Sequence, residues 1–149
     1  GNNQGEYQLV PFVSGAGCIL AFDFGSKRIG VARADTQSRQ ARPLTTLDAT
    51  QDLWAQVSHV IRQHQPGLIV VGWPRGLDGQ HTQQTHATEA FAQELEVRYG
   101  LKVVLQDEAL SSEEAQRRID PKLTIRKQRE VIDAIAAQVI LEGYLHEAK

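Results

Sequence analysis

Short apolar runs alternate along the chain with longer stretches in which apolar residues return at helical spacing. Runs rich in β-branched and aromatic residues predict strands over 18–24, 28–34, 39–45, 67–72 and 101–106. Helical spacing predicts helices over 51–65, 82–99 and 127–146, with a shorter helix starting near Ser111. On the last helix, the packed side is expected to carry Ile132, Ile135, Val139 and Gly143.

The connections between these elements predict the arrangement of the sheet. A tight turn at Gly25-Ser26-Lys27 makes the first two strands antiparallel, and Pro43 suits an edge position for the third. The run 67–72 has no polar alternation, as in a parallel strand covered on both faces, and a right-handed crossover would place it beside the first strand. We therefore expect an α/β fold with a mixed five-stranded sheet, three antiparallel strands then two parallel ones, and helices on both faces.

The predicted domain spans residues 18–149, a length that suits one hydrophobic core. Residues 1–17 mix Gly, Asn and Gln without a sustained period, so we expect a disordered leader or an expression remnant. No apolar run approaches the roughly 18 residues of a membrane span, and no secretory pattern opens the chain. Cys18 is the single cysteine, which excludes an internal disulfide. A cytoplasmic location without a membrane partner is therefore expected.

An acidic residue interrupts the first apolar run, where an ionised carboxylate is costly unless it is paired or bound to a cation. This residue, Asp23, either caps the following turn or belongs to a site. Asp107 and Glu108 follow the fifth strand, and the carboxyl ends of parallel strands meet at one edge of an open sheet. Asp133 lies on or beside the apolar face of the last helix, followed by small residues that permit a close approach to the sheet. These carboxylates are therefore expected to converge.

Converging carboxylates need a counter-cation, because two like charges about 4 Å apart repel by roughly 4 kcal/mol at an effective dielectric constant of about 20. Oxygen ligands alone favour Mg²⁺ or Mn²⁺. Two such ions about 3.5 to 4 Å apart can activate water and stabilise the leaving oxygen in phosphodiester hydrolysis. Together the acids predict a two-metal nuclease, although each acid taken singly is explained as well by a cap or a surface charge.

Basic residues are distributed unevenly, although the net charge is only −2, with 16 basic and 18 acidic residues. One cluster lies between residues 117 and 129, and a second lies between residues 27 and 42. Such clusters are either solvated faces or phosphate-binding surfaces. Because both flank the acidic candidates, we predict nucleic acid as the partner. The predicted contacts are Lys27, Arg28, Arg42, Arg75, Arg117, Arg118, Lys122, Arg126 and Lys127.

Ordered motifs along residues 19–145 match a known family. They are Asp23-Phe24-Gly25 with Gly30-Val31-Ala32, Ala41-Arg42-Pro43-Leu44, Gly72-Trp73-Pro74 with Asp78-Gly79, Asp107-Glu108 with Ser111, and Asp133 with Ala136-Ala137 and Ile140-Leu141. No single motif is specific, but their order and spacing resemble the YqgF family of RNase H-like proteins. Members of this family are known as Holliday-junction resolvases or pre-16S rRNA nucleases.

The resemblance implies catalytic and metal-binding roles for Asp23, Glu108 and Asp133, with Mg²⁺ or Mn²⁺ as the cofactor. Asp107 is expected to face the other side of its strand and to support structure. Ala109 departs from the arginine that the family usually carries after Asp-Glu. A phosphate or intersubunit contact expected there is therefore absent, or is supplied by Arg75 or Arg28.

The leading functional hypothesis is a metal-dependent endonuclease acting on structured nucleic acid. The resemblance favours 5′-end processing of pre-16S ribosomal RNA, with resolution of branched DNA as the alternative. An actin-like kinase would share the phosphate-loop pattern of residues 23–30, but such enzymes need two domains and this chain holds one. A binding module without catalysis is a further alternative, which Ala109 permits and the intact acids oppose. The sequence does not distinguish a monomer from a homodimer.

Overall fold

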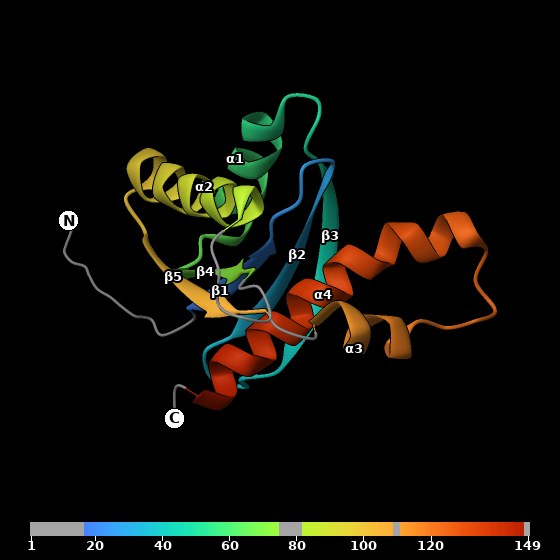
Figure 1. Ribbon diagram of the computed structural model, residues 1–149. Coiled ribbons are helices and arrows are strands. Elements are labelled where there is room, and N and C mark those ends of the chain that lie inside the picture. The colour runs from blue at the N-terminus through green and yellow to red at the C-terminus, as the bar shows by residue number, and fades with distance from the viewer. Residues whose placement is uncertain (1–16, 75–81, 109–110, 148–149) are drawn as a thin grey trace.

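The computed structural model describes residues 17–74, 82–108 and 111–147 (Figure 1). In chain order the elements are β1 (Cys18–Asp23), β2 (Arg28–Asp35), β3 (Ala41–Asp48), α1 (Leu53–His64), β4 (Leu68–Trp73), α2 (Gln83–Tyr99), β5 (Lys102–Asp107), α3 (Ser111–Arg118) and α4 (Ile125–Glu147). This order confirms the predicted one. The expected leader, residues 1–17, lies outside the described residues except for Gly17. Over the described ranges, no helix is both long enough and apolar enough to cross a bilayer.

Five strands form one mixed sheet in the order β3-β2-β1-β4-β5. β1 pairs antiparallel with β2 and parallel with β4, and β4 pairs parallel with β5. The first strand is therefore central and lies beside the fourth, as predicted. β3 is at the edge, and a register irregularity between Val31 and Ala32 of β2 falls next to Pro43.

The third strand starts and ends later than expected, at Ala41 and Asp48 rather than over 39–45. Arg39 has a positive φ of 56°, and its amide donates to the Asp35 carbonyl, so this residue still belongs to the turn after β2. The strand continues to Asp48 because Leu47 is buried in the core. Most of β3 is exposed or half-buried, which left little apolar signal to mark its end.

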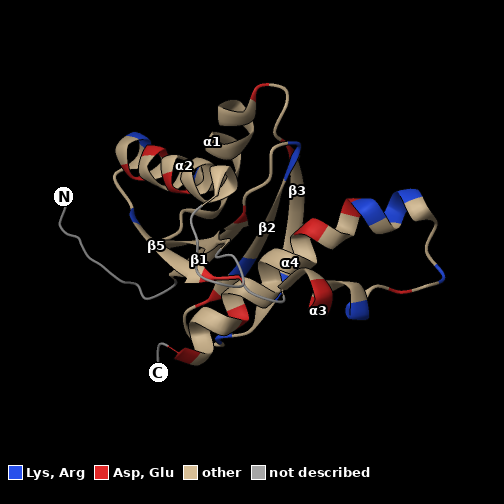
Figure 2. Cartoon of the chain, in the orientation of Figure 1, with Lys and Arg blue, Asp and Glu red and all other residues tan. Residues whose placement is uncertain are grey.

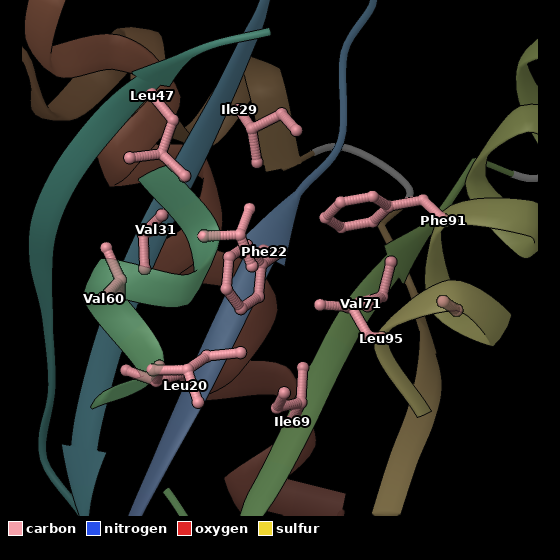
Figure 3. Close-up of a cluster of buried hydrophobic side chains, with 13 residues drawn as sticks. Leu20, Phe22, Ile29, Val31, Leu47, Val60, Ile69, Val71, Phe91 and Leu95 are labelled. Atoms are coloured by element: carbon pink, nitrogen blue, oxygen red, sulfur yellow. The ribbon is translucent and has the colours of Figure 1, made fainter. Parts of the chain in front are cut away.

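Helices α1 and α2 cover one face of the sheet through large apolar side chains (Figures 1 and 3). Leu20, Phe22 and Leu95 are fully buried there. Phe91 of α2 packs on Phe22 with ring centroids 5.8 Å apart and on Trp54 of α1 at 5.4 Å. Each side chain of this size stabilises the fold by roughly 1.5 to 3 kcal/mol when buried, so this face holds much of the stability.

The long helix α4 crosses the opposite face and packs through smaller residues (Figure 1). Its buried side chains are Ala134, Ala136, Ala137, Ile140, Leu141 and Leu145. The expected packed side was wrong, because Ile132, Ile135, Val139 and Gly143 are only half-buried. Alanine faces the sheet because the strands beneath also carry small residues, Ala21 in β1 and Ala32 and Ala34 in β2, and the helix lies close to them.

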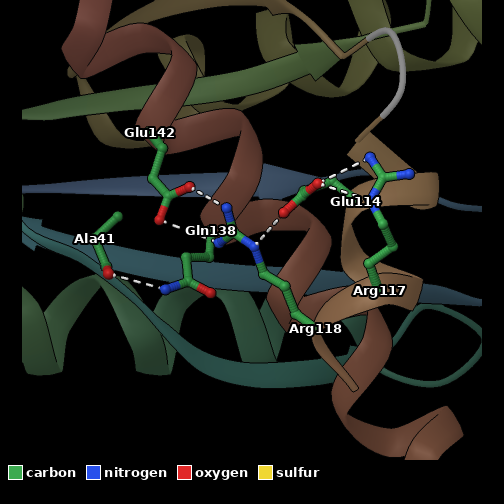
Figure 4. A network of polar contacts seen from close by, with 6 residues as sticks. All are labelled: Ala41, Glu114, Arg117, Arg118, Gln138 and Glu142. Carbon is green, nitrogen blue, oxygen red and sulfur yellow. Dashed lines mark hydrogen bonds and ion pairs between the residues drawn. The ribbon is translucent and has the colours of Figure 1, made fainter. Parts of the chain in front are cut away.

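The short helix α3 is joined to α4 by an ion pair between Arg118 and Glu142 (Figure 4). Arg118 donates to Glu114 of its own helix and, through two nitrogens, to Glu142 of α4. Glu142 and Glu114 together raise the pKa of Arg118 above its ordinary value. In the same view the Gln138 amide donates to the Ala41 carbonyl at 3.0 Å, which joins α4 to the edge strand β3.

Candidate active site

Asp23 is the last residue of the central strand β1 and lies opposite Gly30 of β2. The preceding residues of β1 are buried, so the carboxylate stands where the core meets the rim of the sheet. Burial raises the pKa of Asp23 well above its ordinary value, and the nearby charges of Glu108 and Asp133 raise it further. An acid that served only to cap the turn would not need two other carboxylates beside it.

Glu108 lies one residue beyond β5, where its amide donates to the Trp73 carbonyl with an N–O distance of 3.3 Å. Its carboxylate occupies space that exists because residue 72 is glycine. A Cβ at Gly72 would lie 2.7 Å from Glu108 Oε2 and would also clash with the Ile140 side chain of α4. Oε2 is buried and, among the groups that the structure describes, has no hydrogen-bond partner. Such an oxygen needs a proton or a cation.

Asp23 and Glu108 form an acid pair. Burial is the largest cause of the raised pKa of each carboxyl group. The charge of Asp107 also raises the pKa of Glu108. The close approach of the two carboxyl groups raises the pKa of Asp23 further. The pair therefore shares one proton unless a cation compensates its charge.

Asp133 reaches the same rim because α4 approaches the sheet very closely. Its backbone carbonyl occupies the position that a Cβ at Gly30 would take. Since Gly30 pairs with Asp23 in the sheet, this contact delivers Asp133 beside the acid pair. The side chain is turned toward Arg28, whose Nε donates to Asp133 Oδ2 at 2.8 Å. The Asp133 side chain is 22% exposed and that of Arg28 is 48% exposed, so this ion pair lies at the edge of the site.

The structure thus brings the three predicted acids to one rim without closing them around one point. Within the described ranges, no three His, Cys, Asp or Glu side chains are arranged to hold one metal ion together. The donor set nevertheless fits a divalent cation, because two half-buried carboxylates adjoin and the buried Glu108 Oε2 has no partner among the described groups. The Asp133 side chain would have to turn from Arg28 to join them.

A groove of about 760 Å³ lies between β3 and the first turns of α4, and Arg28, the partner of Asp133, is one of its lining residues. Its basic lining residues are Lys27, Arg28, Arg126, Lys127 and Arg129. Figure 2 shows this basic colouring on the N-terminal turns of α4 and at the start of β2. Two acids, Asp48 and Glu130, also line the groove. Because Arg28 belongs both to the groove and to the acidic rim, a phosphate in the groove would lie near the carboxylates.

Four of the predicted nucleic-acid contacts do not line this groove: Arg42, Arg117, Arg118 and Lys122. Arg75 falls outside the described residues. Arg117 and Arg118 both donate to Glu114 of their own helix. Arg42 pairs in register with Arg33, toward the end of the sheet away from Asp23. Lys122 is exposed in the segment that joins α3 to α4. Of the predicted contacts, Lys27, Arg28, Arg126 and Lys127 line the groove, whereas Arg42, Arg117, Arg118 and Lys122 do not.

Two glycines and one ion pair are the features that sequence reasoning missed. Gly30 and Gly72 belong to the motifs named above, but the need for glycine at these positions appears only in the structure. Gly30 leaves room for the backbone of α4, and Gly72 leaves room for the Glu108 carboxylate. The available signal was a glycine inside an otherwise apolar strand, which often marks a close approach. The pair between Arg28 and Asp133 joins residues 105 positions apart and had no local signal.

The acids after β5 differ in exposure. Asp107 is exposed at the end of the strand, whereas Glu108 is half-buried and carries the unpartnered oxygen described above. This difference agrees with the expectation that the two side chains face opposite ways. Ala109 and the Asp78-Gly79 motif lie outside the described residues.

Known proteins resemble this chain in sequence over most of its length. The family described as RuvX, Holliday junction resolvase, matches residues 17–147. A "Putative pre-16S rRNA nuclease" of Methylobacillus flagellatus is 42% identical over 137 residues, which cover 90% of this chain and 94% of that protein. A protein of the same name from Nitrosococcus oceani is 41% identical over 131 residues, covering 87% of this chain and 86% of that protein.

Solved structures share the fold at low sequence identity. The Fowlpox virus resolvase in complex with substrate Holliday junction DNA has a TM-score of 0.57 at 13% identity, covering 88% of this chain and 98% of that one. RuvC of T. thermophilus in complex with a Holliday junction substrate has a TM-score of 0.53 at 12% identity, covering 89% and 95%. These likenesses confirm the RNase H-like fold. Because the family match and the relatives span most of the sequence, the chain belongs to the RuvX family, the YqgF family that its motifs resemble.

Proposed function

We propose that this protein is a divalent-metal-dependent endonuclease that hydrolyses phosphodiester bonds in structured nucleic acid. The observation that supports it most is the half-buried pair of Asp23 and Glu108, in which Glu108 Oε2 is buried and unpartnered among the described groups. Two such carboxylates are stable together only with a proton or a cation between them. The family relationship and the basic groove beside Arg28 agree with a nucleic-acid substrate.

Asp23, Glu108 and Asp133 would hold Mg²⁺ or Mn²⁺, because all their donor atoms are carboxylate oxygens. Two such ions, when bound, would supply an activated water and a stabilised leaving oxygen. The chain itself positions the substrate. Its groove cations Lys27, Arg28, Arg126 and Lys127 would bind phosphates on either side of the cut and hold the strand against the acids.

The substrate we propose first is pre-16S ribosomal RNA, because the similar proteins of Methylobacillus flagellatus and Nitrosococcus oceani carry that substrate in their names. Its 5′ region is the part that the family resemblance implies. A cytoplasmic location would suit this substrate. Branched DNA is the second candidate, supported by the family description and by the junction-bound resolvases that share the fold.

The direct test offers three substrates side by side with Mn²⁺ or Mg²⁺: a pre-16S rRNA 5′ leader, a four-way DNA junction and a plain single strand. Wild type should cut the leader or the junction, and Asp23→Asn should lower the rate by more than about 100-fold, because it removes a metal ligand without opening a cavity. Glu108→Gln should lose activity in the same way. Asp107→Asn is the matched control and should keep most of it, because this neighbouring side chain is exposed.

The outcomes separate the alternatives. Cutting of the leader alone would establish the ribosomal RNA substrate, and cutting of the junction alone would establish branched DNA. If wild type cuts neither with any metal tried, or if Asp23→Asn cuts equally well, the nuclease assignment is wrong and a nucleic-acid-binding module is the better account. Circular dichroism of each variant shows whether a loss of activity reflects a loss of fold.

A further inference from the structure

Arg28 belongs to two neighbouring features at once, the acidic rim and the basic groove. Its Nε donates to Asp133 Oδ2 at 2.8 Å, and its side chain lines the groove with Lys27 and the first turns of α4. We propose that Arg28 is an exchangeable counter-ion: a phosphate of nucleic acid in the groove draws Arg28 from Asp133, and Asp133 then binds metal with Asp23 and Glu108. This inference rests on the proposed function and adds to it a way in which substrate completes the metal site.

The geometry restricts the change to side chains. The backbone of Asp133 is seated against Gly30, so the helix has no room to move further toward the sheet. The Asp133 carboxylate already lies near enough to Asp23 to raise its pKa, and in this proposal a change of the Asp133 side-chain rotamer turns it from Arg28 toward that rim. Arg28 is the first residue of β2 and is 48% exposed, so its guanidinium can follow a ligand into the groove.

The ion pair is weak enough to exchange. Breaking an ion pair at the protein surface changes the equilibrium constant of a competing binding reaction by only about two- to fivefold. The bond to Asp133 uses Nε, so the terminal nitrogens of the guanidinium are not needed for it. A phosphate offers Arg28 a bidentate acceptor, for which arginine is better suited than lysine.

Four other charged residues of the groove contact groups other than the three acids. Arg126 and Lys127 lie 3.8 Å and 3.5 Å from Glu130 of their own helix. The Asp48 carboxylate accepts from the amide and the hydroxyl of Thr50. Among the described groove residues, Arg28 is therefore the one whose ion pair reaches the acidic rim.

This arrangement predicts reciprocal coupling between the two ligands. If bound nucleic acid releases Asp133, it tightens metal binding, and metal must tighten nucleic-acid binding by the same factor. Removal of the Arg28 guanidinium should remove the competition between Arg28 and metal for Asp133. It should therefore also remove the coupling between metal binding and nucleic-acid binding.

The test compares wild type with Arg28→Gln and with Lys27→Gln, the matched control that removes a neighbouring groove cation. Calorimetric titration without nucleic acid should show that Arg28→Gln binds Mn²⁺ about two- to fivefold more tightly than wild type. Lys27→Gln should bind Mn²⁺ like wild type. Fluorescence anisotropy of a labelled four-way DNA junction, with Ca²⁺ or with EDTA, should show metal-enhanced binding for wild type and Lys27→Gln and none for Arg28→Gln. A gel run after each titration verifies that the junction is intact.

Each result bears on one claim. Arg28→Gln binding Mn²⁺ no more tightly than wild type, or keeping the full metal enhancement, would overturn the exchange while leaving the nuclease proposal standing. Absence of Mn²⁺ binding by every protein would overturn the metal site, and the exchange with it. Arg28→Lys should restore much of the junction affinity but little of the coupling, because lysine lacks the guanidinium fork; full coupling in this variant would also contradict the proposal.

Discussion

The two faces of the sheet are packed in different ways, and only the face under α4 brings a helix to the acids. On the face under α1 and α2, large side chains such as Phe22 and Phe91 fill the space between helix and sheet. On the face under α4, the buried cluster includes alanines of both the helix and the strands, and at Gly30 the helix backbone itself meets the strand. A large buried side chain stabilises a fold but keeps backbones apart, whereas glycine and alanine allow a functional residue to be placed close to the strand.

A first way to test this contrast is Phe91→Ala on the α1 and α2 face. We expect a loss of about 3 to 5 kcal/mol in the free energy of unfolding, because the substitution leaves a cavity among packed rings. Guanidinium chloride unfolding measures this loss. The Mn²⁺ affinity of the folded fraction should not change, and a clear change would mean that the two faces are not independent.

Gly30→Ala tests the opposite face. Its Cβ would meet the Asp133 carbonyl, so α4 must shift. We expect a loss of about 1 to 3 kcal/mol in the free energy of unfolding, toward the upper end because the clash is with backbone. Unlike Phe91→Ala, it should also abolish the rise in melting temperature caused by Mn²⁺, because Asp133 is displaced. Gly67→Ala is the control, since a Cβ there meets nothing within 4 Å. Equal stability of Gly30→Ala and Gly67→Ala would contradict the close approach.

Gly72→Ala should separate function from stability. Its Cβ would lie 2.7 Å from Glu108 Oε2, and a side chain moves more easily than a backbone, so the expected destabilisation is only about 1 kcal/mol. Calorimetric titration should show Mn²⁺ affinity reduced by about tenfold or more, because the carboxylate is pushed from its place. Gly143→Ala, with its Cβ 3.4 Å from Gln106 Nε2, provides a control that should keep wild-type affinity.

Asp23→Asn should give the smallest change in stability, and that change should depend on pH. The folded protein raises the pKa of Asp23, so without metal the wild type loses stability as pH increases from the unfolded value, about 3.9, through the raised folded value. The Asp23→Asn variant should not lose stability in this way, because asparagine does not ionise. In EDTA at pH 7.5 the variant should therefore have a higher melting temperature than wild type, by about 2 to 4 °C for each kcal/mol gained in the free energy of unfolding. The difference should disappear near pH 4. A pH-independent difference would show that charge is not its cause.

The sequence by itself determined the order of the elements and the place of the acids on a common rim. Continuous apolar runs marked β1 and β4 as central, and the parallel crossover then required Asp23 and Glu108 to lie at the same edge of the sheet. Asp133 was found because an acid on an apolar helix face is costly and therefore informative. These inferences succeed because hydrophobic period and strand direction are local properties of the chain.

Only the tertiary structure decided which residues hold those acids in place. The packed side of α4 was predicted along Ile132, Ile135 and Val139, whereas the buried side carries three alanines together with Ile140, Leu141 and Leu145. The close approach of the helix depends on Gly30, on a strand about 100 residues away in the sequence. The Arg28 and Asp133 pair and the space at Gly72 arise in the same way. The spacing of residues within one segment does not show whether the segment packed against it carries a glycine or a charged side chain at the point of contact.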